Sequence, residues 1–467
     1  MDKREFLPIF KDFQDSPIEA GTPEADLAIW NAATLLDANY NLDILSVIKL
    51  RGRDLNAALR SRVPDHFCLY PFTNFQLDPD GRARPCCKYK VGDATWQEYV
   101  PKLPEANIQE LWEQPELTGL RAKFLRGEKP AGCKACWEEE AAGIPSMRLT
   151  RQSGGKQHPF ATFFHHVPRQ TPSTLDFKLS NLCNFKCRIC TPFLSSQWIK
   201  EAKDLNIEDM GTHDSFTVNA KEKFSEDPNN KLILKTWAPN VKFLEFYGGE
   251  PLMQQEHDEI LDIMHEYGNP LSMSLYYNTN SSICKEQFFK KWQLFGEVHI
   301  NFSIDDIDQR FEYQRKNGKW KETVANVATY QLLSKKYNVN MHIKLYVTVS
   351  ILNVFYLNEF FTAVQPWDVK ITLNMVHYPH HYAIHILPKH VKDVIKEKLE
   401  LITTGNLHQN SPSIQQIINF MYGAESNTEL MKTFFEKTEL HDTYRGESFS
   451  DTFPELYAIL KGKKNEK

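Results

Sequence analysis

The 467-residue sequence lacks any run of about 18 apolar residues, the length that a helix needs to cross a membrane. Its first residues, MDKREFLPIFKDFQD, mix charged and apolar side chains and lack the apolar core of a secretion signal. The net charge of −5 excludes the strong positive field with which proteins hold nucleic acid regardless of its sequence. We therefore expect a cytoplasmic protein with no membrane span and no nucleic-acid partner.

Cysteine is the residue type that carries the most information. Thiols in the cytoplasm stay reduced, so the nine cysteines are better candidates for metal or redox ligands than for disulfides. Eight of them fall into two groups, an upstream group and a three-cysteine loop: Cys68, Cys86, Cys87, Cys133 and Cys136, and then Cys183, Cys187 and Cys190. Cys284 stands alone, and we interpret it as a small core residue.

Beyond residue 173, short apolar strands alternate with longer amphipathic segments. Strand patterns occur at 174–180, 242–247, 271–277, 297–303, 341–349 and 369–376. Helical patterns such as HDEILDIMHEY and KETVANVATYQLLSKKY separate most of them. This repetition predicts an α/β fold with a parallel sheet. Because six strands are too few for a closed eight-stranded barrel, we expect a partial (β/α)6 TIM-like barrel over residues 173–390.

The rest of the chain divides into three parts. Residues 1–65 have helical patterning and no motif with an evident chemistry. Residues 66–150 hold the upstream cysteines among turn signals, including a hairpin in LDPDGRARPCC whose turn is Pro79-Asp80-Gly81. Residues 391–467 are predicted to be helical. We therefore expect a small cysteine-rich module before the barrel and a helical segment after it.

Polar or glycine-rich groups follow four successive strand patterns. The loop SNLCNFKCRIC follows the first, and YGGEP, YNTN and SIDD follow the next three. In α/β proteins the carboxyl ends of parallel strands meet at one edge, where ligands bind. Paired glycines allow a ligand to approach the backbone, and a neighbouring carboxylate can bind a ligand amine. Because four successive strands have such groups at their carboxyl ends, we expect these groups to form one shared binding site.

Three cysteines in eleven residues raise the question of the missing fourth ligand. A structural zinc ion takes four protein ligands, and a cubane iron–sulfur cluster has four iron corners. A group of three leaves one corner open, and an open corner is where chemistry can occur.

In these motifs the chain resembles the radical S-adenosylmethionine (radical SAM) enzymes. Their CxxxCxΦC loop is matched by Cys183, Cys187, Ile189 and Cys190. Their GGE motif is matched by YGGEP, and their serine-and-aspartate motif by SIDD. Arg315 lies where related enzymes often have an arginine near the SAM carboxylate. The resemblance implies that SAM contacts Gly248, Gly249, Glu250, Asn280, Ser303 and Arg315.

The resemblance also implies the cofactors and the reaction. The three thiolates would hold a [4Fe–4S] cluster, and the amino and carboxylate groups of SAM would bind its fourth iron. An electron from the cluster would cleave SAM to a 5′-deoxyadenosyl radical, which takes a hydrogen atom from the substrate. A flavodoxin- or ferredoxin-type protein is the expected low-potential electron donor.

The upstream cysteines resemble the SPASM/twitch auxiliary-cluster module of radical SAM enzymes. The matching elements are Cys68, the PDGRARPCC hairpin, NIQELWEQPELTGLR and CKAC. The implied ligands of a second [4Fe–4S] cluster are Cys68, Cys86 or Cys87, Cys133 and Cys136. We favour Cys86, which matches the module's single required cysteine after the hairpin. In the familiar arrangement the module follows the barrel, whereas here it precedes it. A structural zinc site is the alternative.

The predicted function is hydrogen abstraction from a substrate, with a peptide or protein preferred over a small molecule such as a sugar. Two alternatives are a non-catalytic zinc- or iron–sulfur-binding interaction protein and a radical SAM-fold subunit without turnover. The substrate, the oligomeric state and the catalytic residues beyond the cofactor ligands remain open. The loop VHYPHHYAIH, with His377 and His385, could bind a metal, contact the substrate or lie in solvent.

Overall fold

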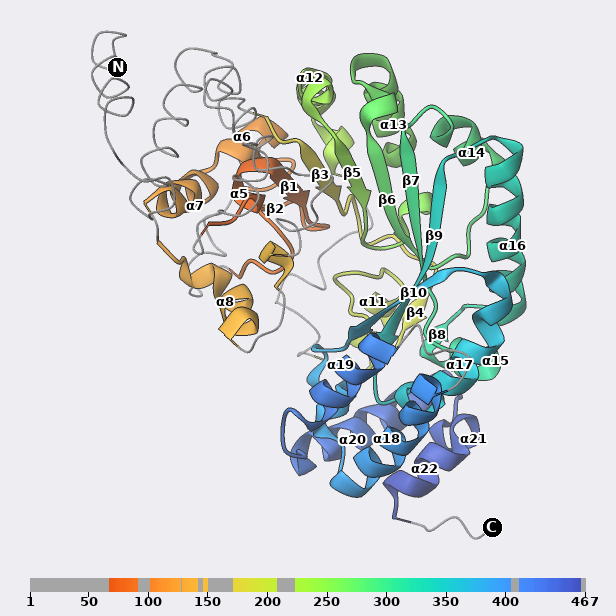
Figure 1. The fold of residues 1–467 in the computed structure, drawn as a ribbon. Helices are drawn as coiled ribbons and strands as arrows, with labels where there is room; N and C mark the ends of the chain where they lie inside the picture. Colours follow the sequence, from red (N-terminus) through yellow and green to blue (C-terminus); the bar gives the residue numbers. More distant parts are fainter. Residues whose placement is uncertain are drawn as a thin grey trace, which may run out of the picture. The chain divides into compact units, whose positions relative to one another are not determined.

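The computed structural model describes residues 67–90, 101–126, 128–141, 146–149, 171–207, 223–404 and 411–462. The chain divides into two compact units (Figure 1). Unit 1 comprises Met1–Asp176 and Asp227–Phe243, and unit 2 comprises Phe177–Glu226 and Leu244–Lys467. The helical patterning predicted for residues 1–65 lies outside the described residues.

Unit 1 is built from short elements. They are α5 (Tyr70–Thr73), β1 (Asn74–Leu77), β2 (Ala83–Arg84), α6 (Ile108–Glu113), α7 (Pro115–Leu125), η3 (Ala131–Cys133), α8 (Lys134–Ala141), β3 (Thr174–Phe177), α12 (Pro228–Trp237) and η6 (Ala238–Asn240). β1 and β2 form the predicted antiparallel hairpin. Gly81 takes φ +88° in its turn, where a Cβ atom would lie 2.7 Å from the backbone oxygen of Leu103. The turn therefore requires glycine.

Local signals and one aromatic cluster stabilise unit 1. Asn107 and Glu110 form a reciprocal capping box at the start of α6. The next helix, α7, begins with Pro115, whose fixed φ suits a first helical turn. The ring of Phe75 in β1 packs edge-on against Trp112 of α6 and Trp237 of α12. Residues far apart in the sequence thus share one small core.

Unit 2 is organised around a parallel sheet. Its strands are β5 (Phe243–Phe246), β6 (Ser274–Thr279), β7 (Glu297–Ser303), β9 (Met341–Val349) and β10 (Lys370–Met375). The hydrogen-bonded order is β10-β9-β7-β6-β5, and the pairs β6–β7, β7–β9 and β9–β10 are parallel. Phe177, the last residue of β3, accepts a hydrogen bond of 3.0 Å from the backbone N–H of Tyr247 after β5. The predicted partial barrel is confirmed, because the described strands follow one another without closing a ring.

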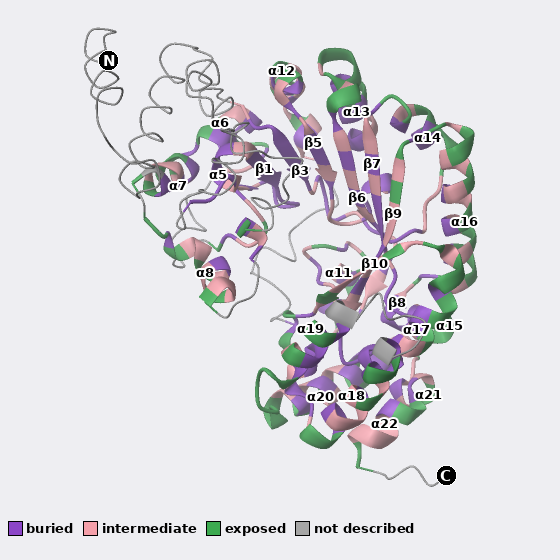
Figure 2. Cartoon of the chain, in the orientation of Figure 1, coloured by how far each residue is buried: buried purple, intermediate pink, exposed green. Residues whose placement is uncertain are grey.

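Helices cover one face of this sheet. They include α13 (Gln255–Tyr267), α14 (Glu286–Trp292), α16 (Trp320–Lys336) and α17 (Leu357–Val364). In β7, Val298, Ile300 and Phe302 are fully buried, and Phe302 packs against Tyr330 of α16. Successive strand residues point to opposite faces, so Glu297, His299, Asn301 and Ser303 lie on the other face. That face is called the inner face below. On it, Glu297, His299 and Ser303 are half-buried, the class that Figure 2 draws in pink.

The C-terminal part of unit 2 is helical, as predicted. Its helices are α18 (Lys389–Thr404), α19 (Ser411–Tyr422), α20 (Thr428–Arg445), α21 (Phe449–Thr452) and α22 (Pro454–Leu460). Asn427 caps the start of α20, and Gly446 ends it with φ +64°. Figure 1 shows these helices grouped in the blue part of the chain.

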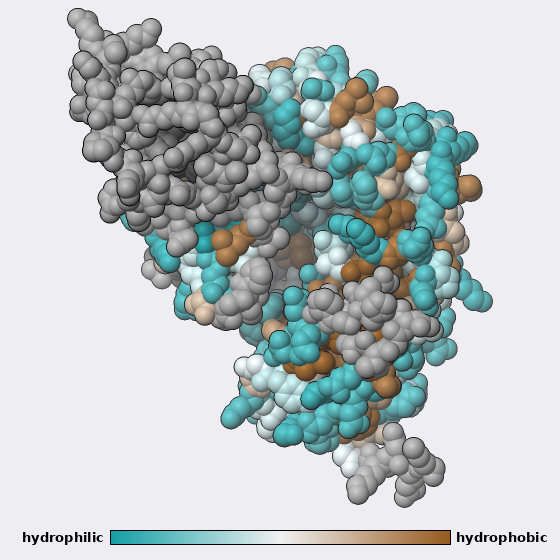
Figure 3. All heavy atoms as spheres, viewed as in Figure 1, coloured by the Kyte–Doolittle hydropathy of each residue, from teal (hydrophilic) through white to brown (hydrophobic). Residues whose placement is uncertain are grey.

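The surface of the described part is mainly polar. On the face drawn in Figure 3, hydrophilic residues in teal cover most of the coloured area. The most exposed large apolar side chains are Leu232, Leu271, Leu332 and Leu401. No helix among the described residues combines the length and apolar character that a membrane crossing requires.

Candidate functional site

The three-cysteine loop follows β3 and is folded back on itself in unit 2. Cys187 belongs to the short strand β4 (Lys186–Cys187), which pairs antiparallel with β8 (Arg315–Lys316). The backbone N–H of Cys190 donates to the Cys187 oxygen at 3.0 Å. The N–H of Cys183 donates to Ser196 Oγ at 3.3 Å. Backbone hydrogen bonds therefore hold all three cysteines in one compact loop.

The environment of the loop disfavours free thiolates. Burial, together with the charge of Cys187, raises the pKa of Cys183 to about 12. Burial also raises the pKa of Cys187 and of Cys190, and Cys190 is affected by both other cysteines. The three sulfurs are therefore close enough to repel one another as thiolates. A positively charged group bound between them would favour their deprotonation.

The glycines of the GGE motif lie against the cysteine loop. Gly248 has φ +70° and Gly249 has φ +56°. A Cβ atom on Gly249 would lie 2.3 Å from the backbone oxygen of Leu182. The N–H of Gly249 donates to Leu194 O at 3.1 Å, and the N–H of Glu250 donates to Leu182 O at 2.8 Å. These glycines thus allow the backbone after β5 to approach the cysteine loop closely. Sequence patterns do not reveal this contact.

Glu250 is fully buried and connects two strand ends. Its carboxylate accepts hydrogen bonds from Thr279 Oγ1 at 2.7 Å and from the N–H of Asn280 at 2.8 Å, both at the end of β6. Burial raises the pKa of Glu250 to about 7, although these hydrogen bonds oppose the shift. Asn280 in turn donates through Nδ2 to Asn184 Oδ1 at 2.8 Å and lies 3.9 Å from Cys183 Sγ. These residues therefore link the second and third strand ends to the cysteine loop.

An ion pair borders the other side of the loop. Arg315 Nη2 lies 2.7 Å from Asp305 Oδ2, and Arg315 Nη1 lies 3.7 Å from Cys187 Sγ. Both side chains of the pair are less than a tenth exposed. Asp305 also accepts a hydrogen bond from the Thr348 N–H at 2.8 Å, which fixes its orientation. Ser303, the last residue of β7, is half-buried and is in register with Tyr346 of β9.

Arg188, between Cys187 and Cys190, is a residue that the motif analysis missed. Its side chain is 1% exposed and forms ion pairs with Asp442 of α20 and, at 2.6 Å, with Glu447. Its guanidinium lies 3.8 Å from the centre of the Tyr313 ring. A buried charge is tolerated only when it is paired. The C-terminal region therefore holds the cysteine loop, although Asp442 and Glu447 are 254 and 259 residues from Arg188 in the sequence.

A second charged cluster reinforces this contact. Glu201 of α11 (Trp198–Asp204) has a fully buried side chain. Its oxygens lie 2.7 Å from His441 Nδ1 and 3.0 Å from Arg445 Nε, and it also pairs with Lys186. Burial alone would raise the pKa of Glu201, but these three partners lower it to about 2. The carboxylate thus stays charged at neutral pH and connects α20 to the residue before Cys187.

In unit 1, four of the five upstream cysteines line one pocket. The pocket is lined by Cys68, Tyr70, Cys86, Lys88, Tyr89, Cys133, Cys136, Met147 and Arg148. Burial raises the pKa of Cys133 to about 12, and the charges of Cys86, Cys133 and Cys136 help to raise that of Cys68. Cys87 is exposed, and its sulfur lies 3.7 Å from Met147 Sδ. The choice between Cys86 and Cys87 as a ligand stays a prediction, and the lining of this pocket favours Cys86.

The spacing of the sulfurs bears on the zinc alternative. Among the described residues, Glu297, His299 and His342 form the only group of three or more possible ligands whose donor atoms all lie within 4.8 Å of one another. Neither cysteine site is that compact. Around a zinc ion with Zn–S bonds of about 2.3 Å, tetrahedral geometry places sulfurs about 3.8 Å apart. In the described structure, neither cysteine site therefore has the spacing of a preformed tetrahedral zinc site.

The histidines after β10 do not gather into such a group either. His377 and His385 both pack edge-on against Phe420 of α19. Among the described residues they belong to no three-ligand set within 4.8 Å. The structure thus gives no support to the metal alternative for this loop.

Comparison with known proteins finds partial matches. The family model SPASM, an iron–sulfur cluster-binding domain, matches residues 68–137. The GTP 3',8-cyclase of Aliarcobacter butzleri (strain RM4018) is 22% identical over 161 residues, which are 34% of this chain and 39% of that protein. The GTP 3',8-cyclase of Vibrio atlanticus (strain LGP32) is 25% identical over 141 residues, 30% of this chain and 36% of that protein.

The chain is similar to an iron–sulfur SPASM domain over residues 68–137 and to GTP 3',8-cyclases over about a third of its length. Its SPASM module precedes the partial barrel in the sequence, as the order of the cysteines indicated. The matches cover less than two fifths of the length of the Aliarcobacter and Vibrio proteins.

Two solved structures show a remote likeness. "Native anSMEcpe with bound AdoMet and Kp18Cys peptide" is 18% identical, with a TM-score of 0.35, over 51% of this chain and 61% of that chain. Streptococcus suis SuiB bound to S-adenosylmethionine is 14% identical, with a TM-score of 0.32, over 73% of this chain and 70% of that chain. Likenesses this remote identify no substrate for this chain.

Proposed function

We propose that the chain cleaves S-adenosylmethionine reductively at a [4Fe–4S] cluster held by Cys183, Cys187 and Cys190. The cluster and SAM would supply an electron and a 5′-deoxyadenosyl radical that abstracts hydrogen from a substrate. The observation that carries the proposal is the set of three neighbouring thiols in one loop at the carboxyl edge of a parallel sheet, beside Arg315 and Asn280. The expected electron donor is a flavodoxin- or ferredoxin-type protein.

The protein's own residues would position and insulate this site. Arg315 places a positive charge 3.7 Å from Cys187 Sγ, which favours the thiolate form of that ligand. Asn280 lies beside Cys183, and the paired glycines bring the end of β5 onto the loop. We assign the SAM contacts to Gly248, Gly249, Glu250, Asn280, Ser303 and Arg315. Both oxygens of Glu250 also accept hydrogen bonds from the end of β6, so this carboxylate would orient that strand end as well.

Cys68, Cys86, Cys133 and Cys136 would hold a second [4Fe–4S] cluster. Four thiols around one pocket can occupy all four corners, so this cluster would have no open position. The SPASM match over residues 68–137 supports the assignment. Reduced thiols in both sites require a reducing compartment, which is why we place the protein in the cytoplasm.

For the substrate we propose a polar molecule, and within that class a peptide or protein. The inner face of the sheet carries amide side chains, with Asn301 Nδ2 donating to Asn278 Oδ1 at 2.9 Å. Such groups can exchange hydrogen bonds with a peptide backbone. A nucleotide is the second candidate, because the curated relatives are named GTP 3',8-cyclase. Formation of a nucleotide product from GTP would decide for the second candidate.

The test of the proposal is SAM cleavage by the full chain. Protein reconstituted with iron and sulfide without oxygen, then reduced, should be brown and should release 5′-deoxyadenosine from SAM. Cys187→Ala removes one cluster ligand and should abolish that release. Cys284→Ala, which changes a cysteine outside both sites, should leave it unchanged. Equal release from the wild-type protein and Cys187→Ala would refute the proposal, and a colourless protein with bound zinc would favour the structural-metal alternative.

A further inference from the structure

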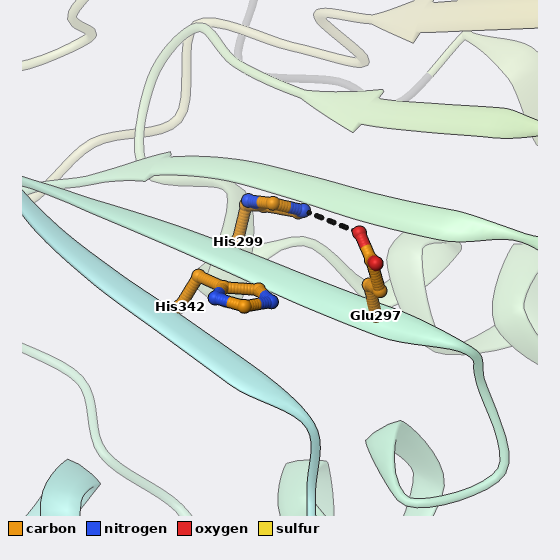
Figure 4. Close-up of side chains that lie close together, drawn as sticks. All are labelled: Glu297, His299 and His342. Carbon is orange, nitrogen blue, oxygen red and sulfur yellow. Dashed lines mark hydrogen bonds and ion pairs between the residues drawn. The ribbon is translucent and has the colours of Figure 1, made fainter. Parts of the chain in front are cut away.

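Three potential metal ligands lie together on the inner face of the sheet, on strands that the cysteine sites do not use. Glu297 and His299 come from β7, and His342 comes from β9 (Figure 4). Their donor atoms all lie within 4.8 Å of one another, and Glu297 Oε2 is 3.0 Å from His299 Nε2. In the close-up, both imidazole rings extend toward the glutamate.

The sheet itself produces this convergence. His299 and His342 are in register between the parallel strands β7 and β9, and Glu297 precedes His299 by two residues on the same face. Tyr276 of β6 is in register with His299 on the other side. Its ring stacks on His299 at 4.2 Å, and His299 stacks on His342 at 4.7 Å. The three stacked rings restrict the orientation of His299 before any ligand arrives.

We propose that Glu297, His299 and His342 form a binding site for a divalent metal ion of the zinc class. Two imidazoles and one carboxylate are a ligand set that proteins use for zinc sites with an open position. Those sites keep the remaining coordination position for water or a substrate group. The side chain of Glu297 is 38% exposed and that of His299 is 12% exposed, so an ion can enter from solvent.

The neighbouring charge indicates what the open position would bind. Lys344 follows His342 by two residues on the same face of β9. A lysine beside the ion would attract an anionic oxygen donor. We therefore expect a carboxylate of the substrate to occupy the open position.

This ion would be an anchor and not a reaction centre. Ser303 ends β7 at the edge where the cysteine loop lies, four residues beyond His299. At about 3.3 Å per residue, the ion would lie about 13 Å along the strand from that edge. It would therefore hold one end of a polar molecule while the other end approaches the SAM site. The metal site does not depend on SAM cleavage and can be tested separately.

The experiment measures zinc in the intact, cluster-loaded protein without an affinity tag. After reconstitution and removal of loose metal, the protein is dialysed against micromolar zinc, and bound zinc and iron are measured by mass spectrometry. We expect about one zinc per chain in addition to an unchanged iron content. His342→Ala and Glu297→Gln should each lower zinc binding at least tenfold, whereas His265→Ala, at an exposed histidine of α13, should not.

X-ray absorption at the zinc edge provides the second measurement. The proposed site predicts nitrogen and oxygen neighbours at about 2.0–2.2 Å and no sulfur neighbour at about 2.3 Å. A sulfur shell would place the zinc in a cysteine site and overturn the proposal. Equal zinc binding by the wild-type protein and His342→Ala, with far-UV circular dichroism showing both folded, would overturn it as well.

Discussion

The two cysteine sites are assembled in opposite ways. In unit 1 four cysteines from separate segments, the hairpin among them, line one pocket. In unit 2 three cysteines come from one eleven-residue loop, and distant elements contact that loop from outside. The first site therefore depends on bringing its ligands together. The second depends on holding a short loop in one shape.

The charged side chains around the two cysteine sites can be compared in the same way. Each site has a paired arginine beside its cysteines, Arg148 with Glu140 in unit 1 and Arg315 with Asp305 in unit 2. Unit 2 has in addition Arg188 within the loop, which is paired with carboxylates of the C-terminal region. A four-thiol site is saturated by its own ligands, whereas a three-thiol site keeps a position for SAM. We infer that the three-cysteine site depends on more ion pairs from distant residues than the four-cysteine site does.

The largest expected effect concerns the ligands of unit 1. Cys86→Ala should remove the second cluster, so that the iron content falls from about eight to about four per chain. Cys87→Ala is the matched control and should retain about eight, because Cys87 is exposed and lies outside the pocket. Iron analysis after anaerobic reconstitution measures both. The reverse outcome would assign the ligand to Cys87.

A backbone substitution should damage unit 2 through its loop. Gly249→Ala forces a Cβ atom to within 2.3 Å of the Leu182 oxygen at φ +56°, which should cost roughly 3 kcal/mol and displace the cysteine loop. We expect a lower unfolding midpoint and loss of SAM cleavage, with the unit 1 cluster retained. Unchanged 5′-deoxyadenosine release from Gly249→Ala would show that the contact with Leu182 is dispensable.

The charged cluster behind the loop predicts a dependence on pH. The pKa of Glu201 is about 2 in the folded protein, below the usual value of 4.5, so its stabilising effect is present above about pH 4.5 and is lost as the pH falls toward 2. Glu201→Gln should therefore destabilise the protein by about 1–3 kcal/mol at pH 7.

The same linkage predicts that the difference shrinks on acidification. Chemical unfolding of the wild-type protein and Glu201→Gln, followed by circular dichroism at pH 7 and at pH 4, measures it. A difference that stays constant with pH would show that Glu201 acts by packing and not by its charge.

The smallest effect comes from the same glycine-to-alanine change in unit 1. Gly119 lies inside the helix α7, and a Cβ atom there would have no neighbour within 4 Å. Gly119→Ala should stabilise the protein by about 0.5–1 kcal/mol, because alanine loses less backbone entropy in a helix. Thermal unfolding measures the gain. A lower unfolding midpoint for Gly119→Ala would show that a side chain at this position does meet a steric obstacle.

Much of the fold was predictable from local patterns. The strand patterns at 297–303 and 341–349 coincide with β7 and β9, because alternation and flanking turns are written in neighbouring residues. The pattern at 271–277 was placed too early, since Pro270–Ser272 forms a 3-10 turn and β6 begins at Ser274. The hairpin around Gly81 was also predicted, because the turn needs glycine at a positive φ.

By itself, the sequence determined the motif-bearing loops, the order of strands and helices, and the resemblance to radical SAM enzymes, since spacing and periodicity are local properties. Only the tertiary structure decided that Gly249 approaches the cysteine loop, that Glu250 faces the end of β6, and that Arg188 pairs with Asp442. It also placed His299 beside His342, which are 43 residues apart in number and adjacent only through strand register. Ion pairs and strand register depend on contacts between segments that are far apart in the sequence. The residues that flank each segment in the sequence do not indicate which distant segment it will contact.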